Sequence, residues 1–577
     1  MDIVIRGGTV FDGRGTPGRV ADVGIEGGKV VAIDHGLKAP TIIDATGKWV
    51  MPGFIDLHTH YDAEVELAPS LSESLRHGVT TVVMGSCSLS LALGTPEDLA
   101  DMFCRVEAIP YEVVRPLLDR SKSWETVGEY LEHLGELPLG PNVASFLGHS
   151  AIRAHVMGLG RSLERGLRPS EDELRRMESI LDEGLDEGYL GLSVMTLKWD
   201  KMGGSREFRS RPLPSTFARW SEYRRLTRHL RDRGRIFQGV PDVTTKVNAL
   251  LFLFESMGIG RKRLRTTIIS LMDIRANRSI WRVVGAIARF CNRFLGADFR
   301  LQALPEVFDL WADGMDLVVF EEFGAGTDAL HLADLQARAE LLRDPTYREK
   351  FRKQWTSRFL PRAFHRDFNQ SEILECPEAE LVGRSFAEVA QARGEHVVET
   401  FLDLVARHGP ALRWYTVMGN DRRGPLEKIV SHPDILIGFS DAGAHLRNMA
   451  HYNFPLRLLR LVKDAAAEGR PFMTVERAVE RLTGEIAGWL GLDAGVLEEG
   501  RRADVVVVDP AGVDATVDQA TEAEIPGFDG FRRLVRRNDR AVSAVLVNGK
   551  LAVENGAVRD EVGRQRGFGQ VLRAVQS

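Results

Sequence analysis

The chain has 577 residues, of which 44% are hydrophobic and 27% charged, and its formal net charge is −6. This length exceeds what one hydrophobic core organises, so we expect one large domain and one or two smaller ones. The acidic balance, with only short basic runs such as residues 261–263, argues against a nucleic-acid partner.

The spacing of the cysteines and the length of the apolar runs bear on the cellular compartment of the protein. Its four cysteines, at positions 87, 104, 291 and 376, have no paired spacing, so we expect no disulfide framework and a reducing, cytoplasmic compartment. The first residues lack the basic-then-apolar pattern of a signal peptide. No apolar run approaches the ~20 residues of a membrane span, so we expect no membrane partner. A homo-oligomer is compatible with the sequence.

Both ends of the chain have the pattern of short strands. Residues 1–50 contain β-branched runs separated by Gly and Asp-Gly. Residues 491–577 have the same pattern of β-branched runs, here separated by Asn-Gly turns. Neither end is long enough for a core of its own. We therefore predict that the two ends form one small composite β-sandwich, with a large domain inserted between them.

Residues 51–490 alternate between buried-looking strands and amphipathic helices. Ser170 and Glu173 have the spacing of a capping box at the start of one such helix. Alternation over this length favours parallel βαβ units, and about eight strands point to an α/β protein with a TIM-type (β/α)8 barrel. In that fold the active site lies at the carboxyl ends of the strands. Between about residues 305 and 414 the pattern loosens, which predicts a helical insertion or lid.

The first predicted barrel strand leads into His58-Thr59-His60. Side chains two apart on an extended strand point to the same face, so the two imidazoles can bind one divalent metal ion. An isolated pair of this kind can also cap a strand on a wet surface. The Pro-Gly before the strand and the motifs further along favour the metal site.

Several motifs together resemble the amidohydrolase superfamily. They are the His-x-His pair, the segment GFSDAGAH (438–445) at the expected end of the eighth strand, and residues 482–510 leading back to the sandwich. More narrowly, GVTTVVMGSCS (78–88) and GHSAIRAHVMG (148–158) are similar to the N-acyl-D-amino-acid deacylase, or D-aminoacylase, branch. The resemblance covers nearly the whole chain.

This resemblance implies a metal site made of His58, His60, Cys87 and Asp441. A thiolate at Cys87 is a soft, strong zinc ligand, although a lone cysteine in a strand is also a common small core residue. Asp441 can both bind metal and accept a proton from water, and a cation beside it keeps it ionised. Alternatively, Asp441 only forms part of a turn or caps a helix.

The chain departs from the branch at the fifth and sixth strands. The branch places a histidine at the end of each, whereas Gln238 and Ser270 stand at about those positions here. A second metal would then have too few protein ligands. We therefore predict one zinc ion per chain.

Other candidate residues lie near the predicted mouth of the barrel. Lys198 and Arg153 are cations for a substrate carboxylate, or else a rim charge and a structural ion pair. His149 and Gln238 are further substrate-binding candidates, with His149 and Arg153 expected in a strand-to-turn position. His445 is a candidate catalytic residue that polarises the scissile carbonyl or acts as a general acid, and His451 is its alternative on the same loop.

The sequence thus predicts a zinc-dependent amidohydrolase that cleaves an amide C–N bond in a small molecule. The favoured substrate is an N-acyl (D-)amino acid, hydrolysed by metal-activated water with Asp441 as general base and acid. One alternative is a hydrolase of a cyclic amide, a lactone or another amide outside the amino acids. Another is a catalytically silent barrel that acts as a binding protein.

Overall fold

A closed barrel of parallel strands forms the centre of the computed structural model, which describes residues 1–106, 109–242, 245–357, 362–528 and 530–575. Each barrel strand pairs in parallel with the next strand of the barrel, once β8 and its continuation β9 are taken together. The barrel strands are β6 (Phe54–Asp56), β7 (Val79–Met84), β8 (Asn142–Ser145) continued by β9 (Leu147–Gly148), β10 (Gly191–Met195), β11 (Ile236–Val240), β12 (Arg265–Ile268), β13 (Asp298–Ala303) and β17 (Ile435–Ile437).

Backbone hydrogen bonds close this barrel between its first and last strands. The N–H of Leu57 donates to the carbonyl of Gly438 at 3.1 Å, and the N–H of His60 donates to that of Ala442 at 2.7 Å. With β8 and β9 counted as one strand position, eight positions follow one another around the described barrel. The predicted TIM-type architecture is confirmed, and it places the segments after β6, β7 and β17 at one end of the barrel.

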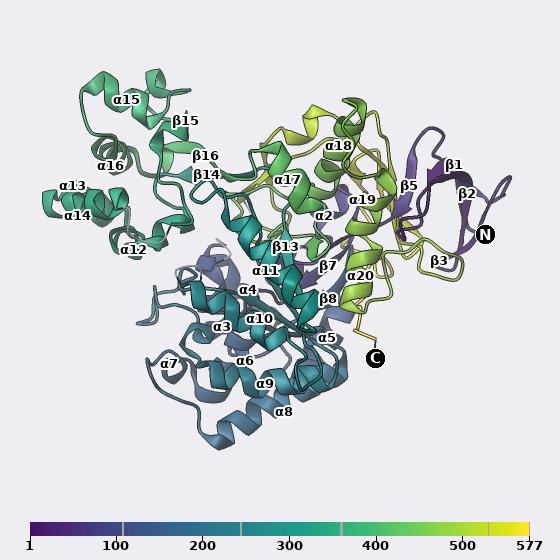
Figure 1. Ribbon diagram of the computed structural model, residues 1–577, viewed down its shortest axis with the longest axis horizontal. Helices are drawn as coiled ribbons and strands as arrows, with labels where there is room; N and C mark the ends of the chain where they lie inside the picture. The colour runs from purple at the N-terminus through teal and green to yellow at the C-terminus, as the bar shows by residue number, and fades with distance from the viewer. Residues whose placement is uncertain (107–108, 243–244, 358–361, 529, 576–577) are drawn as a thin grey trace.

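Helices cover the outside of the barrel (Figure 1). The predicted capping box is present: the Ser170 side chain accepts from the Glu173 N–H, and the Glu173 carboxylate accepts from the Ser170 N–H. The first group of helices comprises α1 (Glu64–Leu67), α2 (Ser72–Arg76), α3 (Pro96–Val106), α4 (Tyr111–Ser121), α5 (Val127–Glu136), α6 (His149–Met157), α7 (Leu159–Ser162), α8 (Glu171–Glu187), η1 (Pro214–Phe217), α9 (Trp220–Asp232), α10 (Lys246–Ser256) and α11 (Ile280–Phe294). The last barrel helices are α17 (Arg423–Val430), α18 (Phe454–Ala467), α19 (Val475–Leu482) and α20 (Gly484–Leu490).

The two chain ends form one sheet, whose strand order is β23-β22-β21-β18-β5-β1-β2-β3 with β4 on β1. Period-two alternation explains how it packs: Val505 and Val507 of β18 enter the sheet's own core, whereas Val506 and Val508 face the barrel core. The predicted composite β domain is thereby held against the barrel. Its strands are β1 (Ile3–Val10), β2 (Arg19–Glu26), β3 (Lys29–Asp34), β4 (Thr41–Asp44), β5 (Trp49–Pro52), β18 (Val505–Val508), β21 (Val542–Val547), β22 (Lys550–Glu554) and β23 (Ala557–Val558). A separate hairpin pairs β19 (Thr521–Glu524) with β20 (Arg532–Val535), after η6 (Ala515–Asp518).

The insertion between β13 and α17 is more than helical, because it also holds an antiparallel sheet in the order β14-β16-β15. An aromatic core binds it together, with Trp355 stacked on Phe368 at a ring distance of 4.4 Å. Figure 1 shows the insertion on the side of the molecule away from the N-terminal strands. Its elements are β14 (Phe308–Asp313), η2 (Val318–Glu322), α12 (Gly324–His331), α13 (Leu335–Arg343), α14 (Pro345–Thr356), η3 (Phe368–Gln370), β15 (Ser371–Glu375), η4 (Ala379–Leu381), α15 (Phe386–Arg393), α16 (Val397–His408), η5 (Gly409–Ala411) and β16 (Arg413–Gly419). Among the helices described, none combines the length and the apolar character that crossing a membrane requires.

Candidate metal centre and active site

The His-x-His segment lies directly after β6, where the barrel closes. Asp56, the last residue of β6, is fully buried and accepts hydrogen bonds from the His58 N–H at 3.3 Å and from the Ser440 hydroxyl. This carboxylate ties the segment after the first strand to the segment after the last one. Burial raises the pKa of Asp56 to about 7, although the bonds from Ser440 and His58 oppose that shift.

Three predicted ligands come together at this end of the barrel. Ligand atoms of His58, His60 and Cys87 all lie within 4.8 Å of one another, and all three residues are buried. The Cys87 Sγ is 3.3 Å from the His58 Nε2. Such a group of imidazole nitrogens and sulfur is the donor set that zinc prefers.

Asp441 lies beside this group. Its Oδ1 is 3.5 Å from the Nε2 of both His58 and His60, and the side chain is 13% exposed. Burial alone would raise the pKa of Asp441, but the hydrogen bond from His60 and the nearby imidazoles bring it to about 2. The Oδ1 is buried and lies close to both imidazole nitrogens, so a carboxylate oxygen is directed at the group of ligands. The four residues therefore fit a divalent cation.

The backbone at the site adopts conformations that ordinary residues seldom take. Cys87, Ser88, Asp441 and His445 have φ values of +54°, +70°, +54° and +50°. Non-glycine residues in this region are uncommon, and they concentrate where the surrounding fold holds a functional geometry. The two loops that present the thiol and the carboxylate share this feature.

A residue that the sequence reasoning missed orients one of the imidazoles. Gln302 on β13 accepts from the His58 Nδ1 through its Oε1 at 2.7 Å, and its Nε2 donates to the Thr267 hydroxyl at 3.2 Å. This fixes the His58 tautomer with Nε2 free for metal. A glutamine in a buried strand carries no distinguishing signal in a single sequence.

Replacing Gln302 with leucine should weaken metal binding by about 10- to 100-fold, because the His58 ring loses its orienting acceptor. Gln302→Glu retains an acceptor at the same place and is the matched control. Competition with a chromogenic chelator measures both variants. Equal metal affinity of Gln302→Leu and the unaltered chain would remove the orienting role.

Gln238 also lies at the site, although not in the substrate space. It is fully buried on β11, its Oε1 accepts from the Cys87 N–H at 3.3 Å, and its Nε2 has no hydrogen-bond partner in the part of the chain described. The side chain that replaces the branch's fifth-strand histidine thus holds the backbone of the Cys87 loop. Ser270 follows the end of β12 and is half-buried.

A cavity of about 350 Å³ includes in its lining His445, whose imidazole interacts with the charge of Asp441. Burial lowers the pKa of this imidazole, while the charge of Asp441 opposes the shift. Asp200 lines it too, with a pKa raised to about 6 by burial. Apolar side chains from the insertion complete one wall, namely Leu317, Val318 and Leu330. The insertion therefore contributes to the wall of this cavity.

Cationic side chains line the same cavity, but the predicted Lys198 is not among them. Lys201, Arg209 and Arg105 all line it. Arg105 is ion-paired with Glu321, whereas the Lys201 Nζ lies 4.0 Å from the other Glu321 oxygen. Lys198, three residues before Lys201, is exposed and does not line this cavity.

His149 and Arg153 were expected in a turn facing the mouth, and that expectation is wrong. A helix, α6, begins at His149, and both side chains are fully buried. Arg153 is ion-paired with Glu222 on α9, and the His149 Nε2 is 3.1 Å from the same carboxylate. Burial next to a carboxylate makes this a structural network between α6 and α9, and neither residue lines the cavity beside the metal group.

His451 likewise lies outside the cavity. It is 2% exposed, its Nδ1 is 3.0 Å from Glu306, and its ring stacks on Phe308. His445 is therefore the histidine of this loop that reaches the substrate space.

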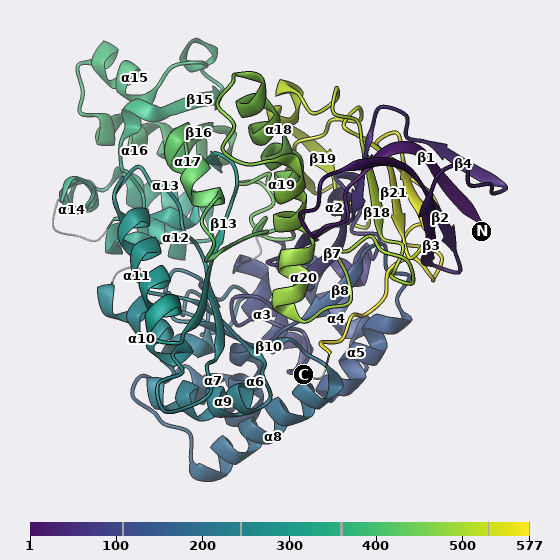
Figure 2. The same cartoon turned by 45° about the vertical axis from the view of Figure 1, so that its right-hand side comes forward.

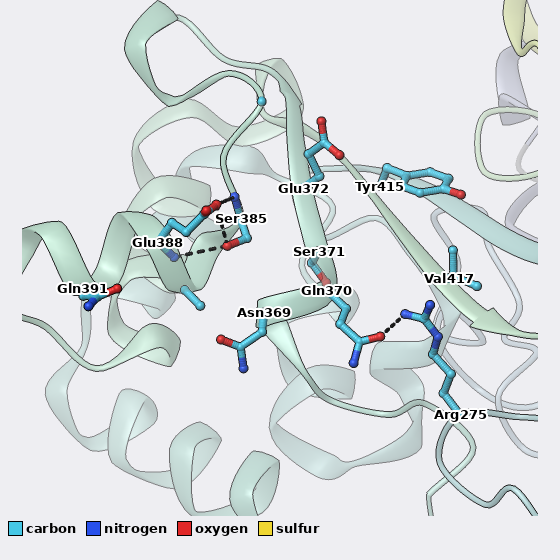
Figure 3. A pocket seen from close by; sticks show the side chains of 12 residues that line it. Arg275, Asn369, Gln370, Ser371, Glu372, Ser385, Glu388, Gln391, Tyr415 and Val417 are labelled. Atoms are coloured by element: carbon cyan, nitrogen blue, oxygen red, sulfur yellow. Dashed lines mark hydrogen bonds between the residues drawn. The ribbon is translucent and has the colours of Figure 1, made fainter. Parts of the chain in front are cut away.

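A larger groove of about 720 Å³ lies in the insertion (Figure 3). Polar side chains from the β15–β16 region line it, and Arg275 donates to the Gln370 carboxamide there. Its lining lacks His445 and Asp200, the two residues of the smaller cavity whose charges interact with Asp441 and His60. We therefore place the chemistry in the smaller cavity beside His445.

Comparisons with known proteins agree with this geometry. A family model described as "Amidohydrolase family" matches residues 41–196. An uncharacterized protein of Mycobacterium tuberculosis is 48% identical over 585 residues, which cover 99% of this chain and 96% of that protein. The D-aminoacylase of Alcaligenes xylosoxydans xylosoxydans is 27% identical over 90% of this chain and 91% of its own.

One solved structure bears on the metal content. A D-aminoacylase structure, 25% identical and covering 99% of both chains, matches with a TM-score of 0.64. It is described as addressing the functional role of the binuclear metal centre in D-aminoacylase, with one-metal activation and second-metal attenuation.

Proposed function

Because the chain belongs to the amidohydrolase family, we propose that it hydrolyses the amide bond of an N-acyl amino acid with one bound zinc ion. Metal-dependent hydrolysis of a C–N bond follows from the family and from the deacylases that the chain resembles. The observation that carries the proposal is the buried group of His58, His60 and Cys87 with the Asp441 carboxylate beside it.

The side chains around the group of His58, His60 and Cys87 favour a single zinc ion. At the fifth strand Gln238 is turned to the Cys87 backbone, and Ser270 follows the sixth strand, so neither place offers an imidazole. The related D-aminoacylase is described as activated by one metal. When bound, the ion would serve as a Lewis acid and lower the pKa of a water molecule from about 16 toward about 7.

Asp441 and His445 have separate roles in the proposed reaction. Asp441, ionised at neutral pH, accepts the proton of the attacking water and returns it to the leaving nitrogen. His445 lines the cavity with its pKa lowered by burial, so its neutral ring can donate a hydrogen bond to the carbonyl oxygen as negative charge develops there. The apolar wall from the insertion suits an acyl chain.

The cavity cations define the expected recognition of a carboxylate. Arg209 lines the cavity, and no carboxylate lies within ion-pair distance of it among the described residues, while the Lys201 Nζ is only loosely placed at 4.0 Å from Glu321. We therefore assign substrate-carboxylate binding to Lys201 and Arg209 in place of the exposed Lys198.

Lys201→Met should raise the KM for an anionic substrate about tenfold with little change in kcat, because it removes binding shared by ground and transition states. Lys198→Met, a lysine on the same loop but outside the cavity, is the matched control. Steady-state kinetics with an N-acyl amino acid and with its uncharged carboxamide separate the two effects. An equal change for both substrates would show that Lys201 does not read the carboxylate.

A substrate panel tests the function itself. The zinc-loaded chain is assayed with N-acetyl-D- and N-acetyl-L-amino acids, a hydantoin, a dihydropyrimidine and a lactone. We expect amine release from the N-acyl amino acids. Ring opening without deacylation would replace the proposal by a cyclic-amide or lactone hydrolase, and a metal-loaded chain without turnover on a broad panel would favour a binding protein.

A further inference from the structure

The outer faces of α10 and α11 both carry exposed apolar side chains. These helices lie side by side on the outside of the barrel in both views (Figures 1 and 2). On each helix the exposed apolar residues recur every three or four positions, which places them in one stripe. We call this surface the α10–α11 face; it consists of Val247, Leu250, Phe254, Ile280, Val283, Ile287, Phe290 and Phe294.

These side chains are exposed although the helices are firmly packed. α11 contacts the barrel through buried residues on its other side, including Trp281, Ala288 and Cys291. Phe290 and Phe294 are nevertheless 55% and 64% exposed, and their rings lie 5.2 Å apart. Contiguous exposed apolar patches on an otherwise well-packed protein mark interaction surfaces.

A stripe of positive charge runs beside the apolar one. Arg282, Arg289 and Arg293 are exposed and follow one another at helical spacing. No carboxylate lies within ion-pair distance of any of these three in the part of the chain that the structure describes. Between residues 246 and 294 the sequence has two acids, Glu255 and Asp273, and both are buried. The face is therefore apolar and cationic together.

We propose that the α10–α11 face binds reversibly to the surface of an anionic lipid membrane. Aromatic and aliphatic side chains on one stripe with arginines on the next are the pattern of helices that lie in the headgroup region. The phenylalanines would enter the boundary between headgroups and acyl chains, and the arginines would contact lipid phosphates. Such binding is peripheral and agrees with the lack of a spanning helix among those described.

Charge argues against a second copy of the chain as the occupant. A two-fold dimer brings the same surface of both subunits together, so arginine stripes without acidic partners would meet each other. An anionic bilayer supplies the opposite charge. This proposal replaces the expectation of no membrane partner, and it does not depend on the proposed catalytic function.

Co-sedimentation of the full chain with vesicles tests the proposal. One set of vesicles contains phosphatidylcholine alone, and the other mixes it equally with phosphatidylglycerol. We expect binding to the anionic vesicles, weakened by high salt. Phe290→Ser/Phe294→Ser and Arg282→Gln/Arg289→Gln/Arg293→Gln should each reduce the partition coefficient about a hundredfold.

Matched controls change the same chemistry elsewhere on the surface. Val382→Ser removes an exposed apolar side chain of the insertion, and Arg165→Gln/Arg168→Gln/Arg176→Gln removes three exposed arginines outside the face. Both should bind as the unaltered chain does. Failure of the unaltered chain to bind anionic vesicles would overturn the proposal. So would a dimer in light scattering that Phe290→Ser/Phe294→Ser dissociates, because a second copy would then occupy the face.

Discussion

Asp441→Asn is expected to lower kcat by about 10³- to 10⁴-fold while the chain stays folded. The asparagine keeps the shape of the side chain but cannot accept the proton of water or return it to the leaving nitrogen. The whole decrease in kcat is expected at neutral pH, because the pKa of Asp441 is about 2 and its carboxylate is ionised there. Steady-state kinetics with the best substrate of the panel measure the loss.

The control separates catalysis from metal loss, since Asp441 lies 3.5 Å from the Nε2 of both imidazoles. Metal content is therefore measured on the same sample, and kcat is expressed per bound ion. Asp493→Asn, a change at an exposed aspartate on the surface, should leave kcat unaltered. Turnover of metal-loaded Asp441→Asn within tenfold of the unaltered chain would end the general-base assignment.

Cys87→Ser is expected to reduce metal affinity by more than about 100-fold. Loss of a residue that only orients a ligand costs up to about 100-fold, whereas this substitution removes a ligand itself. A serine hydroxyl is a poor replacement for a soft thiolate at zinc. Without metal, burial raises the pKa of Cys87 to about 12, so the thiol is protonated at neutral pH and the ion must displace that proton. Affinity should accordingly rise with pH.

Cys291→Ser is the matched control, since Cys291 is also buried but lies on α11 away from the metal group. It should leave metal affinity unchanged. The measurement is metal content after dialysis against a weak chelator, with far-ultraviolet circular dichroism to verify folding. Retention of metal by Cys87→Ser at the level of the unaltered chain would remove the thiol from the site.

Local pattern indicated His58 and His60 as candidate metal ligands, whereas Cys87 and Asp441 were expected from the resemblance to the amidohydrolase superfamily. His58 and His60 are two residues apart after a strand, and the motifs that contain Cys87 and Asp441 each follow a predicted strand. In a parallel barrel all such strand ends meet at one rim, so residues distant in sequence could be expected close together. The structure brings the four within a few ångströms.

Side chains whose role depends on packing were not predictable. Gln302 orients His58 only because β13 places it there, and Lys201 rather than Lys198 lines the cavity because of the path of a loop. Arg153 is neutralised by Glu222, a residue about 70 positions away in sequence, on a different helix. Such pairings arise from tertiary contacts, and a single sequence does not display them.

The insertion was predicted only in outline. Its helices were visible from their apolar periodicity, but β14, β15 and β16 pair across long separations in sequence and were missed. Short strands with such partners carry little local signal, because their stability comes from cross-strand packing. The insertion does contribute to the cavity, since Leu317, Val318 and Glu321 line it, and its role as a lid stays a prediction.

Anomalous diffraction at the zinc edge, from crystals of the full chain purified without chelator, tests the central claim most directly. The account predicts one peak, bounded by the imidazoles of His58 and His60, the Cys87 thiolate and the Asp441 carboxylate. A second peak of similar height near Gln238 and Ser270 would contradict the single-zinc site. The absence of any peak beside Cys87 from crystals of a zinc-loaded chain would contradict the metal centre itself.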